Sequence, residues 1–500
     1  MILADMQSVI DDPIAVRSDN FLLAKFESID ERSGAGSGII WRYPQYDTEQ
    51  TLPEQGFKIH LSATIFNSGE IYDTVVPYLL AKNIHFKVIG SNDLLAKMNS
   101  NRYGYRQVGK FITVYPFDED HAVELSKNLY SLTQEFCSPR IPSDIRLSPT
   151  SIVHYRYGQI IQKLNSLSLS PAYINRPDGT LEKDSRDPNF PIPIWVKDPL
   201  KDIWPQSSCH KLLSNKLFAQ RFILLKTLRQ RAKGGVYLGL DMGNEFSQDT
   251  GLRVINKVVI KEARYLGEIE QSGIDATGRI QWQATIQNKL AFSGISPLIY
   301  DFFCLDKNYY LVMEACGPCS LTEILYQGEM IDSDRKHDWI CSLLNCMVTL
   351  HNENIFFFDL SPDNIRIMEG DTIKLVDFEY ALAPKAPPFI GWDVGTRGFF
   401  PSLALLSKSN IPEAQWAKIR DIYGLGAIIL AILCPEWYKK LLSGEYKLEQ
   451  DSGQSTHYGQ LSIKIKNILA RAALQEGKDH YQTIEELRCD IMNEFTGGER

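Results

Sequence analysis

The residues best suited to chemistry lie between positions 351 and 379. Asp359 is followed five positions later by Asn364, and an apolar strand-like segment, Ile373–Val376, then leads to Asp377. Transfer of a phosphoryl group from a nucleotide needs a carboxylate that orients the attacking hydroxyl and oxygen ligands that hold Mg²⁺ on the phosphates. Asp359 can supply the first, and Asn364 with Asp377 the second. The spacing therefore predicts a phosphoryl-transfer centre.

The surrounding sequence resembles a protein kinase. Lys261 ends a strand-like segment, VVIKEAR, where a kinase holds a lysine on the nucleotide phosphates. Gly234 and Gly235, before Val236, resemble the last part of a glycine-rich loop, although arginines occupy the two earlier glycine positions. Glu314 lies in LVMEACGPCSL, which we expect to join two lobes and to present its backbone to a purine. The expected cofactors are ATP or GTP with Mg²⁺.

Three departures from the kinase pattern accompany this match. Phe357 and Phe358 stand where kinases carry His-Arg, and Glu379 replaces the glycine after Asp-Phe. The helix that should offer a glutamate to the phosphate-binding lysine offers Gln283 and Gln287 instead. Without the arginine, a phosphorylated activation segment has no partner there, so we predict a kinase that works without that phosphorylation. The missing glutamate also leaves open a non-catalytic scaffold on a kinase fold.

The elements that would position these residues indicate an α+β, multidomain chain. Residues 1–170 alternate strands and helices, prolines in 171–205 indicate an extended linker, and 206–500 place short strands before long helices. Asp421 opens an apolar helix and is expected to brace the catalytic loop, unless it is an ordinary helix cap. Expected strands are 58–64, 85–91, 110–116, 222–226, 234–240, 254–262, 299–304 and 309–314, and expected helices are 69–82, 119–135, 281–292, 333–350, 413–418, 421–433, 461–474 and 484–494.

Composition narrows the class of protein. With 500 residues, the chain is too long for one core, and its net charge of −8 argues against nucleic acid as a partner. The nine cysteines are irregularly spaced, which favours a reducing cytoplasm over a disulfide framework. Cys316 and Cys319 form one CxxC without a second pair, so packing is the simpler interpretation. The N-terminus lacks the layout of a signal peptide, and no apolar run is long enough to cross a membrane.

Basic residues recur along the strands of the first half. Lys58 and His60 are two apart on one strand and so share a face. On alternation alone, Lys110 and Tyr115 fall on opposite faces unless their strand is bulged. Together the basic residues could line a site for a dianion, or they could be solvated surface cations. The candidates are Lys58, His60, Lys87, Lys110, Arg146 and Arg156.

The whole chain resembles the lyase and kinase domains of class III and class IV lanthipeptide synthetases. GFKIHLSAT, PYLL, GKFITVYP and HYRYG are similar to their phosphothreonine-lyase-like domain, and RAKGGVY, VVIKEAR, DLSPDN and VDFE to their kinase domain. The resemblance implies phosphorylation of Ser and Thr in a leader-core precursor peptide, followed by elimination of phosphate to dehydroalanine and dehydrobutyrine. It also implies a cyclase, which is here either cut off or a separate protein; class and oligomeric state stay open.

The resemblance also implies roles for the basic residues. Lys87 matches the general base, which must lose its proton, and His60 matches the general acid. Lys58, Arg146 and Arg156 would supply positive charge and hold the phosphate, with Lys110. Two alternatives remain: a Ser/Thr protein kinase whose N-terminal domain only docks its substrate, and the scaffold named above.

Overall fold

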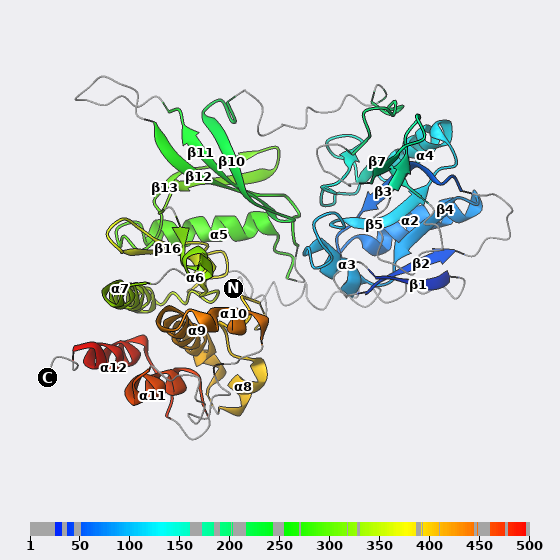
Figure 1. The fold of residues 1–500 in the computed structure, drawn as a ribbon. Helices are drawn as coiled ribbons and strands as arrows, with labels where there is room; N and C mark the ends of the chain where they lie inside the picture. Colours follow the sequence, from blue (N-terminus) through cyan, green and yellow to red (C-terminus); the bar gives the residue numbers. More distant parts are fainter. Residues whose placement is uncertain are drawn as a thin grey trace. The chain divides into compact units, whose positions relative to one another are not determined.

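The computed structural model describes 26–32, 38–44, 52–160, 173–184, 191–201, 203, 217–243, 255–269, 272–317, 319–327, 331–386, 392, 394–409, 411–444, 448, 461–475 and 479–496. These residues belong to two compact units, one from 1–237, 261–277 and 305–309 and the other from 238–260, 278–304 and 310–500. Positions 204–216, where the linker is predicted to end, lie outside the described residues. Helices and sheets are mixed along the chain, which confirms the α+β prediction (Figure 1).

A seven-stranded antiparallel sheet organises the first unit, in the order β1-β2-β4-β5-β3-β7-β6. One face of the central strand β3 carries buried apolar side chains, Phe57, Ile59 and Leu61. These join buried residues of three helices in one core, so the helices cover this face. The strands are β1 (Phe26–Arg32), β2 (Gly38–Pro44), β3 (Gln55–Ser62), β4 (His85–Ile89), β5 (Lys110–Tyr115), β6 (Ile145–Arg146) and β7 (Val153–Gln159), and the helices α2 (Ser68–Ala81), α3 (Asn92–Asn99) and α4 (Glu119–Leu132).

A bulge decides which residues reach the other, polar face. Pairing between β3 and β5 shifts between Leu61 and Ser62, so that Lys110 lies opposite Ser62. Ser62 is two residues after His60 and shares its face. Lys110 and Tyr115 therefore reach the same face, although regular alternation would separate them. The strand is therefore bulged, which is the condition under which the sequence analysis allowed these two residues to share a face.

The described part of the proline-rich segment packs on the same unit. It contains a hairpin, β8 (Tyr173–Asn175) and β9 (Leu181–Lys183), which we did not predict. Its turn is RPDGT, a sequence that favours reversal of the chain. Further on, Leu200 is buried in the core of the N-terminal sheet, and the carbonyl of Pro191 accepts from the β7 backbone. The segment thus lies over a surface, as expected, with local structure of its own.

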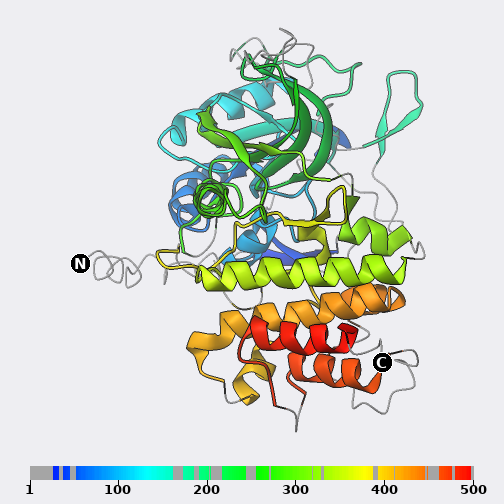
Figure 2. The same ribbon diagram turned by 90° about the vertical axis from the view of Figure 1, so that its left-hand side faces the viewer.

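Short strands come first and long helices later in the rest of the chain, as predicted. A five-stranded sheet has the order β10-β11-β12-β14-β13. Helices α7, α9, α11 and α12 pack in succession (Figure 2). The strands are β10 (Phe222–Arg231), β11 (Gly234–Asp241), β12 (Asn256–Ala263), β13 (Ile299–Leu305), β14 (Asn308–Glu314), β15 (Cys319–Ser320), β16 (Ile365–Ile367) and β17 (Ile373–Leu375), and the helices α5 (Ala276–Lys289), α6 (Leu321–Gln327), α7 (Ser333–Asn352), α8 (Leu403–Lys408), α9 (Trp416–Leu433), α10 (Glu436–Ser443), α11 (Ile463–Ala472) and α12 (Ile484–Thr496).

From Ile422 to Ile432, helix α9 is buried on all sides, because it carries no charged side chain around this part of its circumference. It begins at Trp416, so Asp421 lies inside the helix and the alternative of a cap at its start is wrong. The residues before Asp421 belong to the same helix, and two of them, Ala417 and Ile419, are also buried. Among the described residues, no helix combines the length and apolarity needed to cross a membrane.

Removing one α9 side chain should destabilise the protein strongly. Leu430 is fully buried, so Leu430→Ala leaves a cavity and should lower the free energy of unfolding by about 2–5 kcal/mol. Ile463 in α11 is 77% exposed, and Ile463→Ala should change it by less than about 0.5 kcal/mol. Urea unfolding of the full chain measures both, and equal effects would contradict the packing described for α9.

Candidate functional site

The basic residues of the first half gather on the polar face of the N-terminal sheet. Lys87, Thr113 and His60 lie opposite one another across β4, β5 and β3 and so share this face. Arg156 lies opposite Lys58 on β7. Adjacent strands are about 4.8 Å apart, which puts the Cα atoms of Lys87 and His60 about 10 Å apart. Their side chains can reach one bound phosphorylated residue from two sides.

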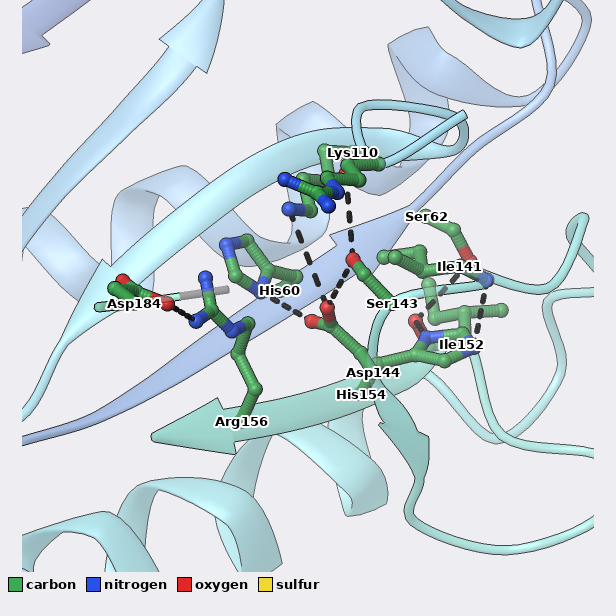
Figure 3. A network of polar contacts seen from close by, with 11 residues as sticks. His60, Ser62, Lys110, Ile141, Ser143, Asp144, Ile152, His154, Arg156 and Asp184 are labelled. Atoms are coloured by element: carbon green, nitrogen blue, oxygen red, sulfur yellow. Dashed lines mark hydrogen bonds and ion pairs between the residues drawn. The ribbon is translucent and has the colours of Figure 1, made fainter. Parts of the chain in front are cut away.

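A buried carboxylate that sequence analysis missed lies at the centre of this group (Figure 3). Asp144 Oδ2 is 2.5 Å from His60 Nδ1, and Asp144 Oδ1 is 4.0 Å from Lys110 Nζ. The hydroxyl of Ser143 donates to Oδ1 at 2.7 Å. Asp144 stands two residues before Arg146, in a segment already noted for its arginine, and that adjacency was the available signal.

The charges around His60 set the protonation of the pair. Burial lowers the pKa of His60 to about 4, with Lys110 and Lys58 acting in the same direction and Asp144 against it. Burial alone would raise the pKa of Asp144, but its interaction with His60 and the positive charges of Lys110 and Arg156 hold it below its ordinary value. Because an ionised carboxylate only accepts, Nδ1 of His60 carries the hydrogen that faces Asp144. Its Nε2 is then the atom that can carry a proton to a ligand.

The two candidate arginines occupy different surroundings. Arg156 is buried and paired with Asp184, which follows the β8–β9 hairpin, and its charge acts on Asp144. Arg146 donates to the carbonyls of Ser138 and Pro149. Arg156 thus belongs to the group around His60, whereas the guanidinium of Arg146 is engaged in shaping the loop beside it.

His154 lies opposite His60 on β7, but its contacts are structural. Its Nε2 accepts from the backbone of Ile141, and Nδ1 lies 3.0 Å from the carbonyl of Ile152. Burial, with Arg146 next, lowers the pKa of His154 well below its ordinary value. A neutral ring whose two nitrogens are engaged by the backbone is a core histidine.

Lys87, the predicted general base, lies beside aromatic rings of β2. Its Nζ is 4.4 Å from the ring centroid of Trp41 and 5.8 Å from that of Tyr43. Aromatic faces attract an ammonium group, so these rings determine where the amine lies before a ligand arrives. Trp41 was not singled out from the sequence.

Asp359 and Asn364, two of the predicted phosphoryl-transfer residues, are in direct contact. Asn364 Nδ2 donates to the carbonyl of Asp359 at 2.9 Å and lies 3.3 Å from its Oδ2. The Asn364 amide oxygen therefore points away from Asp359 and suits a hard cation such as Mg²⁺. Asp377, the second proposed ligand, has a left-handed backbone with φ of +69°. Non-glycine residues in this region are typical of functional sites.

Asp421 braces the catalytic loop, as predicted. Its two carboxylate oxygens accept from the backbone N–H groups of Phe357 and Phe358 at 2.7 and 2.8 Å. His351 Nε2 lies 3.0 Å from the same carboxylate. Phe357, which replaces the usual histidine, packs edge-to-face on Phe378 at 5.0 Å between ring centroids. The apolar substitution thus keeps the loop packed on the segment that carries Asp377.

The predicted glycine-rich segment begins strand β11 in the first unit, directly after a tight turn at residues 232 and 233. Gly234 has φ of +146°, and a Cβ there would collide with the carbonyl of Glu262. The N–H of Gly235, just before Val236, donates to the Glu262 carboxylate at 3.0 Å. Lys261 is buried in β12 next to Glu262. The glycines are therefore explained by close packing of this hairpin on β12.

Glu314, the last predicted nucleotide-binding residue, and the two glutamines of α5 have polar partners in the second unit. In the second unit, Glu314 accepts from Lys374 at 2.5 Å and from the backbone of Leu298 at 3.1 Å. In α5, Gln283 donates to Gln287 at 2.8 Å, and Gln287 donates to the carbonyl of Pro297. These contacts lie within the second unit and hold the segment around Glu314 in place.

Acidification should weaken the N-terminal sheet through His60. Between the ordinary pKa of 6.5 and the folded value of about 4, the unfolded chain binds a proton that the folded chain does not. The contribution of His60 to the free energy of unfolding is therefore fully present above pH 6.5. It is lost as the pH falls toward 4, by up to about 1.4 kcal/mol per pH unit. Hydrogen exchange of β3 peptides in the full chain should show this loss.

His60→Gln is the matched variant, because glutamine does not bind a proton in this pH range. His154 remains, and since its pKa is also lowered, it still makes the protein less stable as the pH falls. The variant's loss of protection on acidification should be shallower than that of the wild type. Parallel curves for the two proteins would contradict a neutral, buried His60.

Comparison with known proteins divides the chain in two. Residues 31–203 match the family described as RamC, N-terminal domain, and residues 252–486 match the protein kinase domain. The catalytic-loop residues lie inside the second match, and the group around His60 lies inside the first.

Three curated relatives are similar to parts of this chain. The chain is 30% identical over 345 residues to a probable SapB synthase of Streptomyces coelicolor, covering 66% of this chain and 36% of that protein. It is 25% identical over 293 residues to the probable serine/threonine-protein kinase PknB of Lactococcus lactis, covering 55% and 42%. The serine/threonine-protein kinase D of Synechocystis is 23% identical over 291 residues, covering 56% and 53%. The chain thus spans between a third and just over half of these relatives. It belongs to the proteins that join a RamC-type N-terminal domain to a protein kinase domain, which confirms the predicted family resemblance.

Proposed function

We propose that this chain dehydrates Ser and Thr residues of a precursor peptide in two steps, phosphorylation and then elimination of the phosphate. The observation that carries the proposal is the buried His60–Asp144 pair on a basic sheet face, in a chain that also holds a kinase catalytic loop. A hydroxyl is a poor leaving group, and phosphorylation converts it into a good one. The two halves then catalyse consecutive reactions on the same side chain.

In the first step, Asp359 orients the hydroxyl of the peptide toward the terminal phosphate of ATP or GTP. Asn364 and Asp377 would hold Mg²⁺, which would offset the negative charge of the phosphates. Lys261 and residues Gly234–Val236 are the proposed phosphate-binding residues, and the backbone at Glu314 is proposed to receive the purine. The orientation of the Asn364 amide supports this assignment, since its Nδ2 is engaged by Asp359.

In the second step, Lys87 Nζ removes the Cα proton of the phosphorylated residue. The electrons of the C–H bond form the Cα–Cβ double bond, and the Cβ–O bond breaks. His60 Nε2 protonates the departing phosphate. Lys58, Lys110 and Arg156 balance its negative charge, while Arg146 shapes the adjoining loop and contributes charge at longer range. The products are inorganic phosphate and dehydroalanine or dehydrobutyrine.

The low pKa of His60 fits an acid that is charged by its own substrate. At neutral pH the ring is uncharged in the empty site. A phosphate dianion beside Nε2 favours the protonated form, as does the Asp144 carboxylate behind Nδ1. Protonation of His60 is therefore linked to the arrival of a phosphorylated side chain.

Loss of the elimination residues should trap the phosphorylated peptide. With nucleotide, Mg²⁺ and a Ser-rich precursor peptide, the wild type should give products lighter by one water per modified residue. Lys87→Met and His60→Gln should accumulate phosphopeptide, with elimination slowed by about 10²–10⁴-fold. Mass spectrometry follows both species. Lys97, an exposed lysine paired with Asp93, provides the control, and Lys97→Met should dehydrate normally.

Loss of the kinase base should have the opposite signature. Asp359→Asn should form no phosphopeptide with either ATP or GTP, yet should release phosphate from a synthetic phosphoserine peptide at the wild-type rate. This second assay separates the proposal from a kinase with a docking domain. If the wild type phosphorylates the precursor but leaves the phosphoserine peptide intact, the N-terminal domain is not a lyase.

A further inference from the structure

Arg420 is a buried arginine inside the apolar helix α9, directly before Asp421. Its side chain is almost completely buried, at 2% exposure. Its guanidinium carbon lies 3.9 Å from the ring centroid of Phe358 and 4.3 Å from that of Phe400. Burial of a charge is costly unless its donors are satisfied, so an arginine at this place in an apolar helix requires specific partners.

The partners of Arg420 are backbone carbonyls of two different segments. Its Nε donates to Phe358 O at 2.7 Å, in the catalytic loop. Its two terminal nitrogens donate to Trp392 O at 2.6 Å and to Val394 O. The latter two residues lie in the activation segment, between Asp377 and α8. One side chain therefore ties the catalytic loop to the activation segment.

The tie acts on a strained position next to the catalytic base. Phe358 has φ of +69°, which is costly for a bulky residue. Asp421 accepts from its N–H, and Arg420 donates to its carbonyl, so consecutive α9 residues fix both ends of one residue. The next residue is Asp359.

The activation segment reaches Asp359 from the other side. The N–H of Thr396 donates to Asp359 Oδ1 at 3.2 Å. Gly395 stands between this contact and the Val394 carbonyl, with φ of +134°. A Cβ at Gly395 would lie 2.5 Å from a terminal nitrogen of Arg420 and 3.4 Å from Asp359 Oδ1. The guanidinium and the catalytic carboxylate thus share the space around this glycine.

We propose that Arg420 is a positioning residue that holds Asp359 and the activation segment in their working geometry without any phosphate. In a kinase that carries an arginine before the catalytic aspartate, a phosphorylated activation segment can pair with it. Here that place holds Phe358, and the guanidinium enters from α9 to bind the same two segments through carbonyls. The inference rests on the proposed kinase activity and names the residue that replaces phosphorylation in that site.

Variants of Arg420 should change turnover and leave nucleotide binding intact. Arg420→Met keeps the length and loses every donor; its kcat for phosphopeptide formation should fall about 100-fold, the loss typical of a catalytic group displaced by about 1 Å. The KM for nucleotide should stay within about twofold, because uniform binding is unaffected. Arg420→Lys retains the charge and a single donor and should be intermediate. Arg488→Met removes a partly exposed arginine paired with Glu485 in the same unit and should match the wild type.

Gly395→Ala tests the same contact without deleting the arginine. Its added Cβ must displace the guanidinium and also strains the backbone at φ of +134°, so it should also lower kcat with an unchanged KM for nucleotide. Folding of Arg420→Met is judged by its thermal shift with Mg-nucleotide. If this variant does not fold, the kcat values of Arg420→Lys and Gly395→Ala test the inference. Wild-type protein treated with phosphatase should keep full activity.

Two results would overturn the inference: folded Arg420 variants with wild-type kcat, or loss of wild-type activity on phosphatase treatment. A wild type that forms no phosphopeptide at all would instead refute the proposed kinase function, so the two failures are distinguishable.

Discussion

A buried carboxylate organises the candidate chemistry in each half of the chain. Asp144 contacts His60 and Lys110 and accepts a hydrogen bond from Ser143. Asp421 accepts hydrogen bonds from two backbone amides of the catalytic loop and contacts His351. Removing one partner of a buried charge leaves the other uncompensated, at a cost of about 3–5 kcal/mol. Neither carboxylate touches substrate in the proposed reactions. Each determines where a reacting side chain lies.

The departures from the kinase pattern have a common physical logic around Asp421. Phe357 replaces a polar residue by an apolar one and packs on Phe378, so the catalytic loop keeps its contact with the segment that carries Asp377. Phe358 stands where kinases carry an arginine, and the guanidinium of Arg420 lies 3.9 Å from the centroid of the Phe358 ring. The positive charge is therefore moved from the loop to the helix behind it. A charge moved in this way can serve the same segments from the opposite side.

Local sequence patterns predicted most elements but not the contacts between them. Alternation and helical periodicity located β3, β4 and β5, the strands of the five-stranded sheet and most of the longer helices, but not β1, β2, β6, β7 or α3. Spacing singled out Asp359, Asn364 and Asp377. Periodicity could not show the bulge after Leu61, because which strand residue is skipped depends on the partner strand. Asp144 was not predicted as a site residue because its partner His60 is 84 residues away in the sequence. Arg420 escaped because a charge at the start of an apolar helix is ordinarily a solvated end, and only the tertiary contacts make it a buried one.

The burial of His60 also explains, under the proposed function, how a chain with two active sites would avoid acting on the wrong residue. Burial keeps His60 uncharged at neutral pH, with its Nδ1 hydrogen committed to Asp144. An unmodified serine brings no charge, so nothing raises the proton affinity of Nε2. A phosphorylated serine brings two negative charges, and the free energy of a buried ion pair can then protonate the ring. Selectivity for the phosphorylated residue thus follows from the same desolvation that lowers the pKa of the acid, without any contact to the rest of the peptide.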